Sequence, residues 1–105
     1  MYANAIYRPR VPTAKTLDEL IAQDQKRFRS EIPDIEIVSD GLLKTLDGKT
    51  ARTWRLAPKS KGQWERVAYF EEGEYYMVFV ISSRAKSGLE KNMSSFEALV
   101  ANYKE

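Results

Sequence analysis

The side chains that could do chemistry in this chain are carboxylates, hydroxyl groups, tyrosines, lysines and arginines. The 105 residues include no histidine and no cysteine. Zinc sites of the Cys/His type, thiol nucleophiles, Ser-His-Asp triads and CxxC redox pairs are therefore excluded. Any catalysis would have to rest on carboxylates and tyrosines placed in a cleft.

Two groups of acidic residues are the candidates for such chemistry. The group from Glu71 to Glu74 stands at an expected hairpin tip, where carboxylates are hydrated and repel one another. Paired-carboxylate hydrolysis and divalent-cation binding need these groups to face each other across a cleft. The group from Asp34 to Asp40 follows no calcium-loop spacing. We expect no catalytic residue, no metal site and no cofactor.

Aromatic and arginine side chains are interleaved on neighbouring expected strands. Flat apolar area with a polar handle can grip a peptide or stack on a base. The Gly and Phe signature of RNA-reading sheets is missing, and the formal charge of +2 is small for a nucleic-acid binder. We therefore favour a protein or small-molecule partner, with core packing as the alternative role of most aromatics. The candidate partner- or ligand-binding residues are Trp54, Arg55, Trp64, Arg66, Tyr69 and Tyr76.

The segment from Trp64 to Ser83 indicates the architecture that must position these residues. It reads as two strands, Trp64 to Phe70 and Glu74 to Ser83, joined at a Glu-Glu-Gly-Glu turn. Both alternating sets of side chains in the second strand are apolar. One set is Tyr75, Met77, Phe79 and Ile81, and the other is Tyr76, Val78 and Val80. Such a strand needs cover on both faces, which predicts helices or a partner chain on each side.

Further strands are expected earlier in the chain. One begins at Ile35, bends near Asp40-Gly41 and resumes from Leu42 to Leu46. Asp47-Gly48 then supplies a tight turn, because glycine accepts the positive φ that such turns need. The next strand runs from Thr50 to Ala57 and is followed by a polar, basic loop from Pro58 to Gly62. Tyr2 to Tyr7 is a candidate fifth strand at the sheet edge.

Helices are indicated on either side of these strands. Thr16-Leu-Asp-Glu19 is a capping box, and the apolar spacing after it predicts a helix from Leu17 to about Ser30. Two capping signals between Ser87 and Glu97 predict a short helical turn and then a longer helix from about Ser95. The expected fold is α+β, an antiparallel sheet of four to five strands with helices packed on it.

The composition fits a single domain over residues 1–105, with 43% hydrophobic and 30% charged residues. No apolar run approaches the roughly 20 residues that a membrane span needs. The start in strand-like sequence suggests an N-terminally trimmed fragment of a longer protein. The first residues lack a signal-peptide pattern, so the chain is either cytoplasmic or has lost a leader.

Three stretches carry a resemblance to a known family. They are Trp64-Glu-Arg-Val-Ala-Tyr-Phe70, Glu74-Tyr-Tyr-Met-Val-Phe-Val-Ile-Ser-Ser83 and Phe96-Glu-Ala-Leu-Val-Ala-Asn-Tyr103. With a helix at Leu17 to Phe28, they resemble the PsbP-like superfamily, named for an extrinsic subunit of photosystem II and including bacterial extracytoplasmic domains. The resemblance implies an α-β-α sandwich, a non-catalytic binding or assembly role, and an extracytoplasmic location. It supplies no site residue, because the matching stretches are hydrophobic patterns.

Three functions follow as hypotheses. The first is a non-catalytic PsbP-like module that binds another protein through a groove beside the sheet. The second is a small-molecule or lipid carrier with an apolar pocket between sheet and helix, lined by Tyr69, Tyr76 and Met93. The third is an α+β enzyme without His or Cys, which requires a carboxylate of strongly perturbed pKa in a cleft. A homodimer through an uncovered sheet face is compatible with all three.

Overall fold

The computed structural model describes residues 2–59 and 63–103, so the predicted loop from Pro58 to Gly62 lies partly outside the described residues. Five antiparallel strands form one sheet in the order β1-β5-β4-β3-β2. The strands are β1 (Tyr2–Tyr7), β2 (Glu36–Lys44), β3 (Thr50–Ala57), β4 (Trp64–Glu72) and β5 (Tyr75–Ser83). The helices are η1 (Arg8–Arg10), α1 (Leu17–Glu31), α2 (Lys86–Lys91) and α3 (Met93–Ala101).

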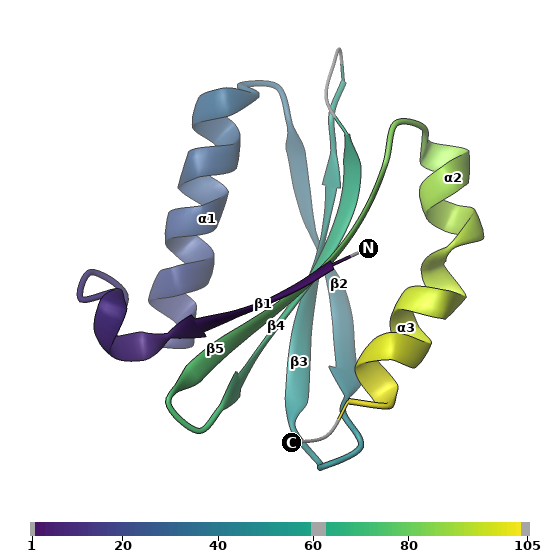
Figure 1. Cartoon of the computed structure of the whole chain (residues 1–105). Helices are drawn as coiled ribbons and strands as arrows, with labels where there is room; N and C mark the ends of the chain where they lie inside the picture. The colour runs from purple at the N-terminus through teal and green to yellow at the C-terminus, as the bar shows by residue number, and fades with distance from the viewer. Residues whose placement is uncertain (1, 60–62, 104–105) are drawn as a thin grey trace.

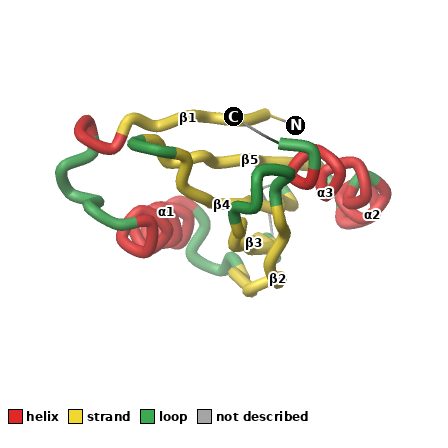
Figure 2. The backbone as a smooth tube through the Cα atoms, turned by 90° about the horizontal axis from the view of Figure 1, so that it is seen from below, coloured by secondary structure: helices red, strands yellow, loops and turns green. Residues whose placement is uncertain are grey.

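The elements form three layers, with α1 on one face of the sheet and α2 and α3 on the other (Figures 1 and 2). The predicted α+β class and the antiparallel sheet with helices packed on it are confirmed. Tyr2 to Tyr7 does form the fifth strand, at the edge beside β5. Within the described residues, no helix has the length and apolar character that a membrane span requires.

The two apolar side-chain sets of β5 build a separate core on each face, as the alternation predicts. Tyr76, Val78 and Val80 lie in the cluster under α1, together with Leu17, Leu20, Ile21, Leu56, Val67 and Tyr69. Phe79 and Ile81 lie in the cluster under α2 and α3, together with Ala51, Ala68, Phe70, Leu89, Phe96 and Val100. Each core forms because a helix removes one apolar sheet face from water.

The start of α1 is fixed by local hydrogen bonds. The Glu19 amide donates to the Thr16 hydroxyl at 3.2 Å, which is the capping contact that the sequence predicts. Just before it, the buried Tyr76 hydroxyl donates to the Ala14 carbonyl at 2.7 Å. The second contact ties the chain entering α1 to the start of β5. The helix therefore starts at a defined place above the sheet.

The helices at the C-terminus start where packing places them rather than where the serine caps predicted. The residues before α2 and α3 are Ala85 and Asn92, and neither side chain forms a hydrogen bond that caps the helix after it. The last helix begins at Met93, two residues before the predicted Ser95. Leu89 and Phe96 are both buried in the cluster under these helices. Their burial sets the helix positions more strongly than the available hydroxyl caps.

A β-bulge explains the predicted bend in β2. The pairing of β2 with β3 shifts between Ser39 and Leu42, and Gly41 has a φ of 90° there. Thr53 on β3 donates its hydroxyl proton to the Gly41 carbonyl at 3.0 Å. Bulges change the direction of nearby side chains. Here the bulge brings Asp40 within reach of arginines on β3 and β4.

Replacing Phe96 with Ala tests how far the fold depends on the cluster under α2 and α3. Phe96 is 0% exposed, whereas Leu99 on the same helix is 40% exposed. Phe96→Ala is expected to lower the free energy of unfolding by about 3–5 kcal/mol, because it opens a cavity in a packed core. Leu99→Ala, the matched control, should cost below about 1 kcal/mol. Urea unfolding of both variants measures the difference, and equal losses would contradict this view of the core.

Candidate functional site

The structure divides the six candidate residues between the two faces of the sheet. The three that face α1 are Trp54, Tyr69 and Tyr76. The three that face α2 and α3 are Arg55, Trp64 and Arg66. The six residues therefore do not form one site. Any binding site draws on one set or the other.

The candidate residues on the α1 side are mainly part of the core. Tyr69 and Tyr76 are buried, and their hydroxyls donate to Asp24 at 3.0 Å and to the Ala14 carbonyl at 2.7 Å. Trp54 is partly buried against the same cluster. Met93 packs on the opposite face. The predicted pocket lined jointly by Tyr69, Tyr76 and Met93 is therefore wrong, since the sheet separates Met93 from the two tyrosines.

Two of the three candidate residues on the other side, Arg55 and Trp64, border an open groove of about 390 Å³, which we call the β2 groove. Its lining residues are Glu36, Val38, Asp40, Arg55, Ala57, Trp64 and Lys86. They come from three strands and from the first turn of α2. The groove thus brings together Arg55 and Trp64, two of the sequence-predicted residues, at the β2 side of the sheet.

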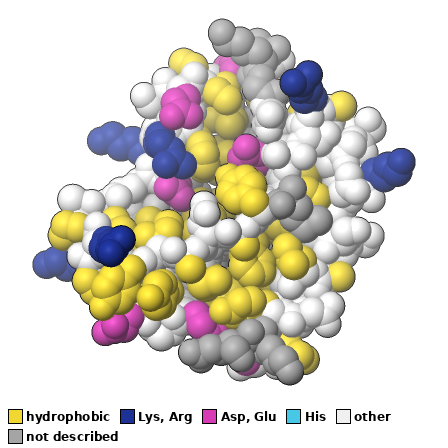
Figure 3. All heavy atoms as spheres, in the orientation of Figure 1, with side chains coloured by type: hydrophobic (Ala, Val, Ile, Leu, Met, Phe, Trp, Pro, Cys, Tyr) yellow, Lys and Arg dark blue, Asp and Glu magenta, His cyan; other side chains and the backbone are white. Residues whose placement is uncertain are grey.

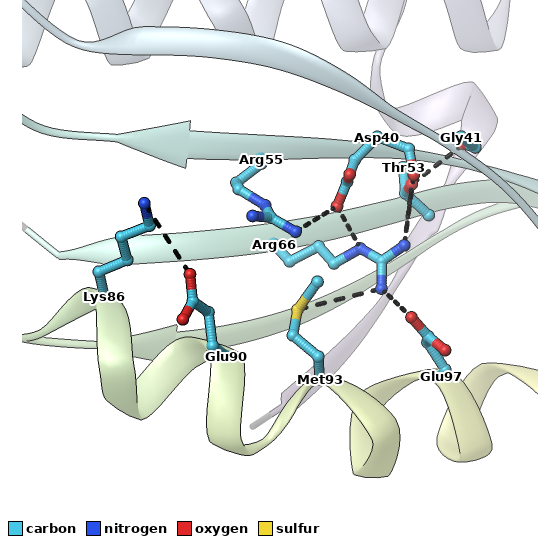
Figure 4. A network of polar contacts seen from close by, with 9 residues as sticks. All are labelled: Asp40, Gly41, Thr53, Arg55, Arg66, Lys86, Glu90, Met93 and Glu97. Carbon is cyan, nitrogen blue, oxygen red and sulfur yellow. Dashed lines mark hydrogen bonds and ion pairs between the residues drawn. The ribbon is translucent and has the colours of Figure 1, made fainter.

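Arg55 and Arg66 stand directly opposite each other on β3 and β4. Two like charges in this position would repel each other. Asp40 relieves the repulsion, because its Oδ2 lies 3.2 Å from Nη2 of Arg55 and 3.0 Å from Nε of Arg66 (Figure 4). The bulge in β2 makes this contact to both arginines possible. One carboxylate therefore bridges three strands.

Arg66 does not line the groove and is only 4% exposed. Its Nη1 lies 2.9 Å from Oε1 of Glu97 on α3, and its Nη2 donates to the Asp40 carbonyl at 3.3 Å (Figure 4). Its guanidinium also sits over the Phe96 ring, 5.6 Å from the centroid. A buried charge is tolerated when it is paired and hydrogen-bonded in this way. Arg66 therefore joins the sheet to α3 and, through its ion pair, holds the groove residue Asp40 in place.

The β2 groove combines apolar area with charged side chains, two acidic and two basic. Trp64 and Val38 supply the apolar area, and Nζ of Lys86 lies 5.9 Å from the centroid of a Trp64 ring. The Nε–H of Arg55 is buried and finds no acceptor among the described residues. A buried donor without an acceptor is costly. The groove is therefore suited to an apolar group with a carboxylate beside it.

A second pocket, of about 180 Å³, lies between α1 and β1, and we call it the α1 pocket. Its lining residues are Tyr2, Asn4, Ile6, Asp24, Arg27, Phe28, Glu65, Val67, Tyr69, Val78 and Val80. Asp24 accepts the Tyr69 hydroxyl and lies 3.7 Å from Nη2 of Arg27. Glu65 is half-buried and forms no hydrogen bond or ion pair with any residue that the structure describes.

Burial changes the acid–base behaviour of this pocket. It raises the pKa of the Glu65 carboxyl, an effect that the charge of Arg27 partly offsets. It also raises the pKa of the Tyr69 hydroxyl, and the nearby charge of Asp24 and the hydrogen bond to it add to the shift. Sequence reasoning missed Glu65. The sequence offered one signal for it: Glu65 falls on the same face of its strand as the apolar residues Val67 and Tyr69.

Comparison with known proteins found no family model, no curated protein and no solved structure that matches this chain. The resemblance to the PsbP-like superfamily therefore stays a prediction from the sequence. The layered arrangement of helices on an antiparallel sheet is observed independently of that resemblance.

The role of Arg66 in joining sheet and helix can be measured by its removal. Arg66→Ala is expected to lower the free energy of unfolding by about 1–3 kcal/mol, because charge-assisted hydrogen bonds are lost while Asp40 and Glu97 regain some water. Arg52→Ala removes an exposed pair with Asp18 and should cost about 0–1 kcal/mol. Thermal and urea unfolding of both variants provide the comparison. Equal losses would mean that the Arg66 network contributes no more than a surface pair.

The raised pKa of Tyr69 predicts how the free energy of unfolding changes at alkaline pH. Because its pKa is raised in the folded state, the bond to Asp24 stabilises the fold fully below the ordinary tyrosine pKa of about 10. This stabilisation is lost progressively as pH rises through the higher folded-state value. Wild type should therefore exceed Tyr69→Phe in unfolding free energy at about pH 8, and the gap should narrow above about pH 10. Tyr75→Phe is the exposed control, and a gap independent of pH would refute the assignment.

Proposed function

We propose that this protein is a non-catalytic binding module, of PsbP-like type, that takes an extended segment of a partner protein in the β2 groove. One observation carries the proposal. Arg55 presents an unsatisfied buried Nε–H beside the apolar surface of Trp64, in a groove supported by the ion pairs of Asp40 and Arg66. Aromatic and arginine side chains at the centre of a groove are the residues that most often dominate binding energy.

The chemistry of the groove specifies the partner segment. An apolar side chain would pack against Trp64 and Val38, and a neighbouring carboxylate would accept from Arg55 and be attracted by Lys86. In the described part of the chain, β2 has a strand on one side only. An extended segment can therefore also pair with its outer backbone groups. The proposed partner is a protein with an exposed apolar–acidic segment.

The absence of histidine and cysteine supports a binding role over a catalytic one. Asp40, a carboxylate that lines the groove, is committed to ion pairs with Arg55 and Arg66. The enzyme hypothesis retains one group of perturbed pKa, Glu65, in the α1 pocket on the other face. The carrier hypothesis also moves to that pocket, since the lining first expected for it is divided by the sheet.

The homodimer stays a prediction. Helices lie on both faces of the sheet, and the most exposed tyrosines lie instead on β1 and β5, where Tyr2 is 53% and Tyr75 45% exposed. Hydrophobic side chains gather across the face that β1 occupies in the foreground (Figures 1 and 3). Self-association, if it occurs, is therefore expected at the β1 edge.

Peptide display with the purified protein as bait tests the proposed function. The selected peptides should pair an apolar residue with a nearby Asp or Glu, and Arg55→Ala should weaken their binding about 10- to 100-fold, as expected for a hydrogen bond to a charged group. Arg52→Ala is the matched control, because Arg52 lies on the same strand but faces α1 and pairs with Asp18. Titration by calorimetry gives the affinities.

Two results would overturn the proposal. One is selection of peptides that bind Arg55→Ala and wild type equally well. The other is backbone amide shifts, on peptide addition, that map to α1 rather than to β2 and α2. Trp64→Ala serves as a second groove variant, provided that its unfolding curve shows a folded domain.

A further inference from the structure

The α1 pocket is a place where helix cover is incomplete. Its floor is apolar, with Val67, Val78 and Val80 from the two central strands. Its rim includes Tyr2 from β1, which is 53% exposed, and Phe28 from α1. The volume of about 180 Å³ is close to that of a known benzene-binding cavity of roughly 150 Å³. A ligand of one small ring or a short alkyl chain therefore fits.

The charges that line this pocket do not balance. Asp24 is satisfied, because it accepts the Tyr69 hydroxyl at 3.0 Å and pairs with Arg27 at 3.7 Å. Arg27 also lies over the Phe28 ring, with its guanidinium carbon 5.1 Å from the centroid, and its charge offsets only part of the effect of burial on the pKa of Glu65. Glu65 forms no ion pair or hydrogen bond with the described residues. The pocket is therefore lined by two carboxylates and one guanidinium, and the unpaired carboxylate, Glu65, is half-buried beside the apolar floor.

A half-buried carboxylate without a partner is unfavourable for folding. A residue of this kind in a pocket is a common mark of a binding site, because binding sites retain polar or charged groups that lower the stability of the fold. A metal ion would need several oxygen ligands. Within residues 2–59 and 63–103, no three acidic side chains lie close enough together to hold a metal ion. A ligand with one positive charge and an apolar body would pair with the carboxylate of Glu65 and pack on the apolar floor.

We propose that the α1 pocket binds a small organic monocation, a protonated amine with a hydrocarbon body about the size of one ring. The ammonium pairs with Glu65, and the body lies on the three valines. The rings of Tyr2 and Phe28 add cation–π attraction at the rim. The pocket lies on the opposite face from the β2 groove, so this inference does not depend on protein binding there.

Binding of the amine should depend on pH in a known direction. Burial raises the pKa of Glu65, and the charged or titratable groups that face it are Asp24 and Arg27 from α1, Tyr69 from β4 and Tyr2 from β1. Only ionised Glu65 attracts an ammonium. Amine binding should therefore weaken as pH falls through the raised pKa of Glu65, while the amine itself stays protonated.

Three probes of nearly identical shape test the charge requirement: benzylamine, benzyl alcohol and benzoate. Binding to the full chain is followed by amide shifts at neutral pH. We expect saturable binding of benzylamine at the α1 pocket, with affinity at least tenfold above that of the other two. Equal binding of benzyl alcohol or benzoate, or no binding of benzylamine, would overturn the proposal.

Glu65→Gln supplies the second arm. It should remove the preference for benzylamine and at the same time raise the midpoint of thermal unfolding at neutral pH, because it replaces a buried charge by a neutral group. Glu65→Asp should keep part of the preference. Glu31→Gln is the control, because Glu31 is exposed on α1 and lines neither the α1 pocket nor the β2 groove, so it should leave benzylamine affinity unchanged. Unchanged benzylamine binding by Glu65→Gln, or a lower midpoint, would refute the role of Glu65.

Discussion

Burial of both faces of β5 is the constraint on which the rest of this structure depends. A strand with apolar side chains in both directions cannot leave either face in water, so the sheet must lie between two layers. The structure meets this requirement with α1 on one face and the pair α2 and α3 on the other. The contact of Tyr76 with Ala14 and that of Arg66 with Glu97 then attach each helix layer to the sheet.

Two neighbouring residues of β4 show how such a fold separates structure from binding. Glu65 and Arg66 are adjacent, so they point to opposite faces, and each places a charge among apolar side chains. Arg66 is paired with Asp40 and Glu97 and becomes part of the scaffold. Glu65 has no such partner among the described residues, and its pKa is raised by burial. On one face, residues of the chain balance the charge of Arg66. On the other face, the proposed ligand would balance the charge of Glu65.

Sequence reasoning succeeded where side-chain period alone decides the outcome. The alternation in β5, the capping box at Thr16 and the bend at Gly41 all correspond to observed features. It failed where the side-chain period was not applied to the aromatic residues, and where segments distant in sequence had to be related. Trp64 and Tyr69 were grouped by residue type, although an odd separation on one strand puts them on opposite faces. Tertiary packing decides which helix covers which face of the sheet. It also decides that the bulge in β2 directs Asp40 to two arginines.

The positions of both proposed sites follow from the widths of the elements. Five strands about 4.8 Å apart form a sheet more than 19 Å wide, whereas one helix with its side chains covers about 10 Å. A single helix layer therefore leaves margins uncovered, and side chains at those margins are neither fully core nor fully surface. On the α1 face the α1 pocket opens on the β1 side of the helix, and Glu65 lines it from the start of the central strand β4. On the other face the β2 groove opens on the β2 side, with Arg55 from β3 and Trp64 from the start of β4. Because the sheet separates the two sites, a ligand at one need not exclude a protein at the other, although the neighbouring residues Trp64 and Glu65 of β4 line one site each.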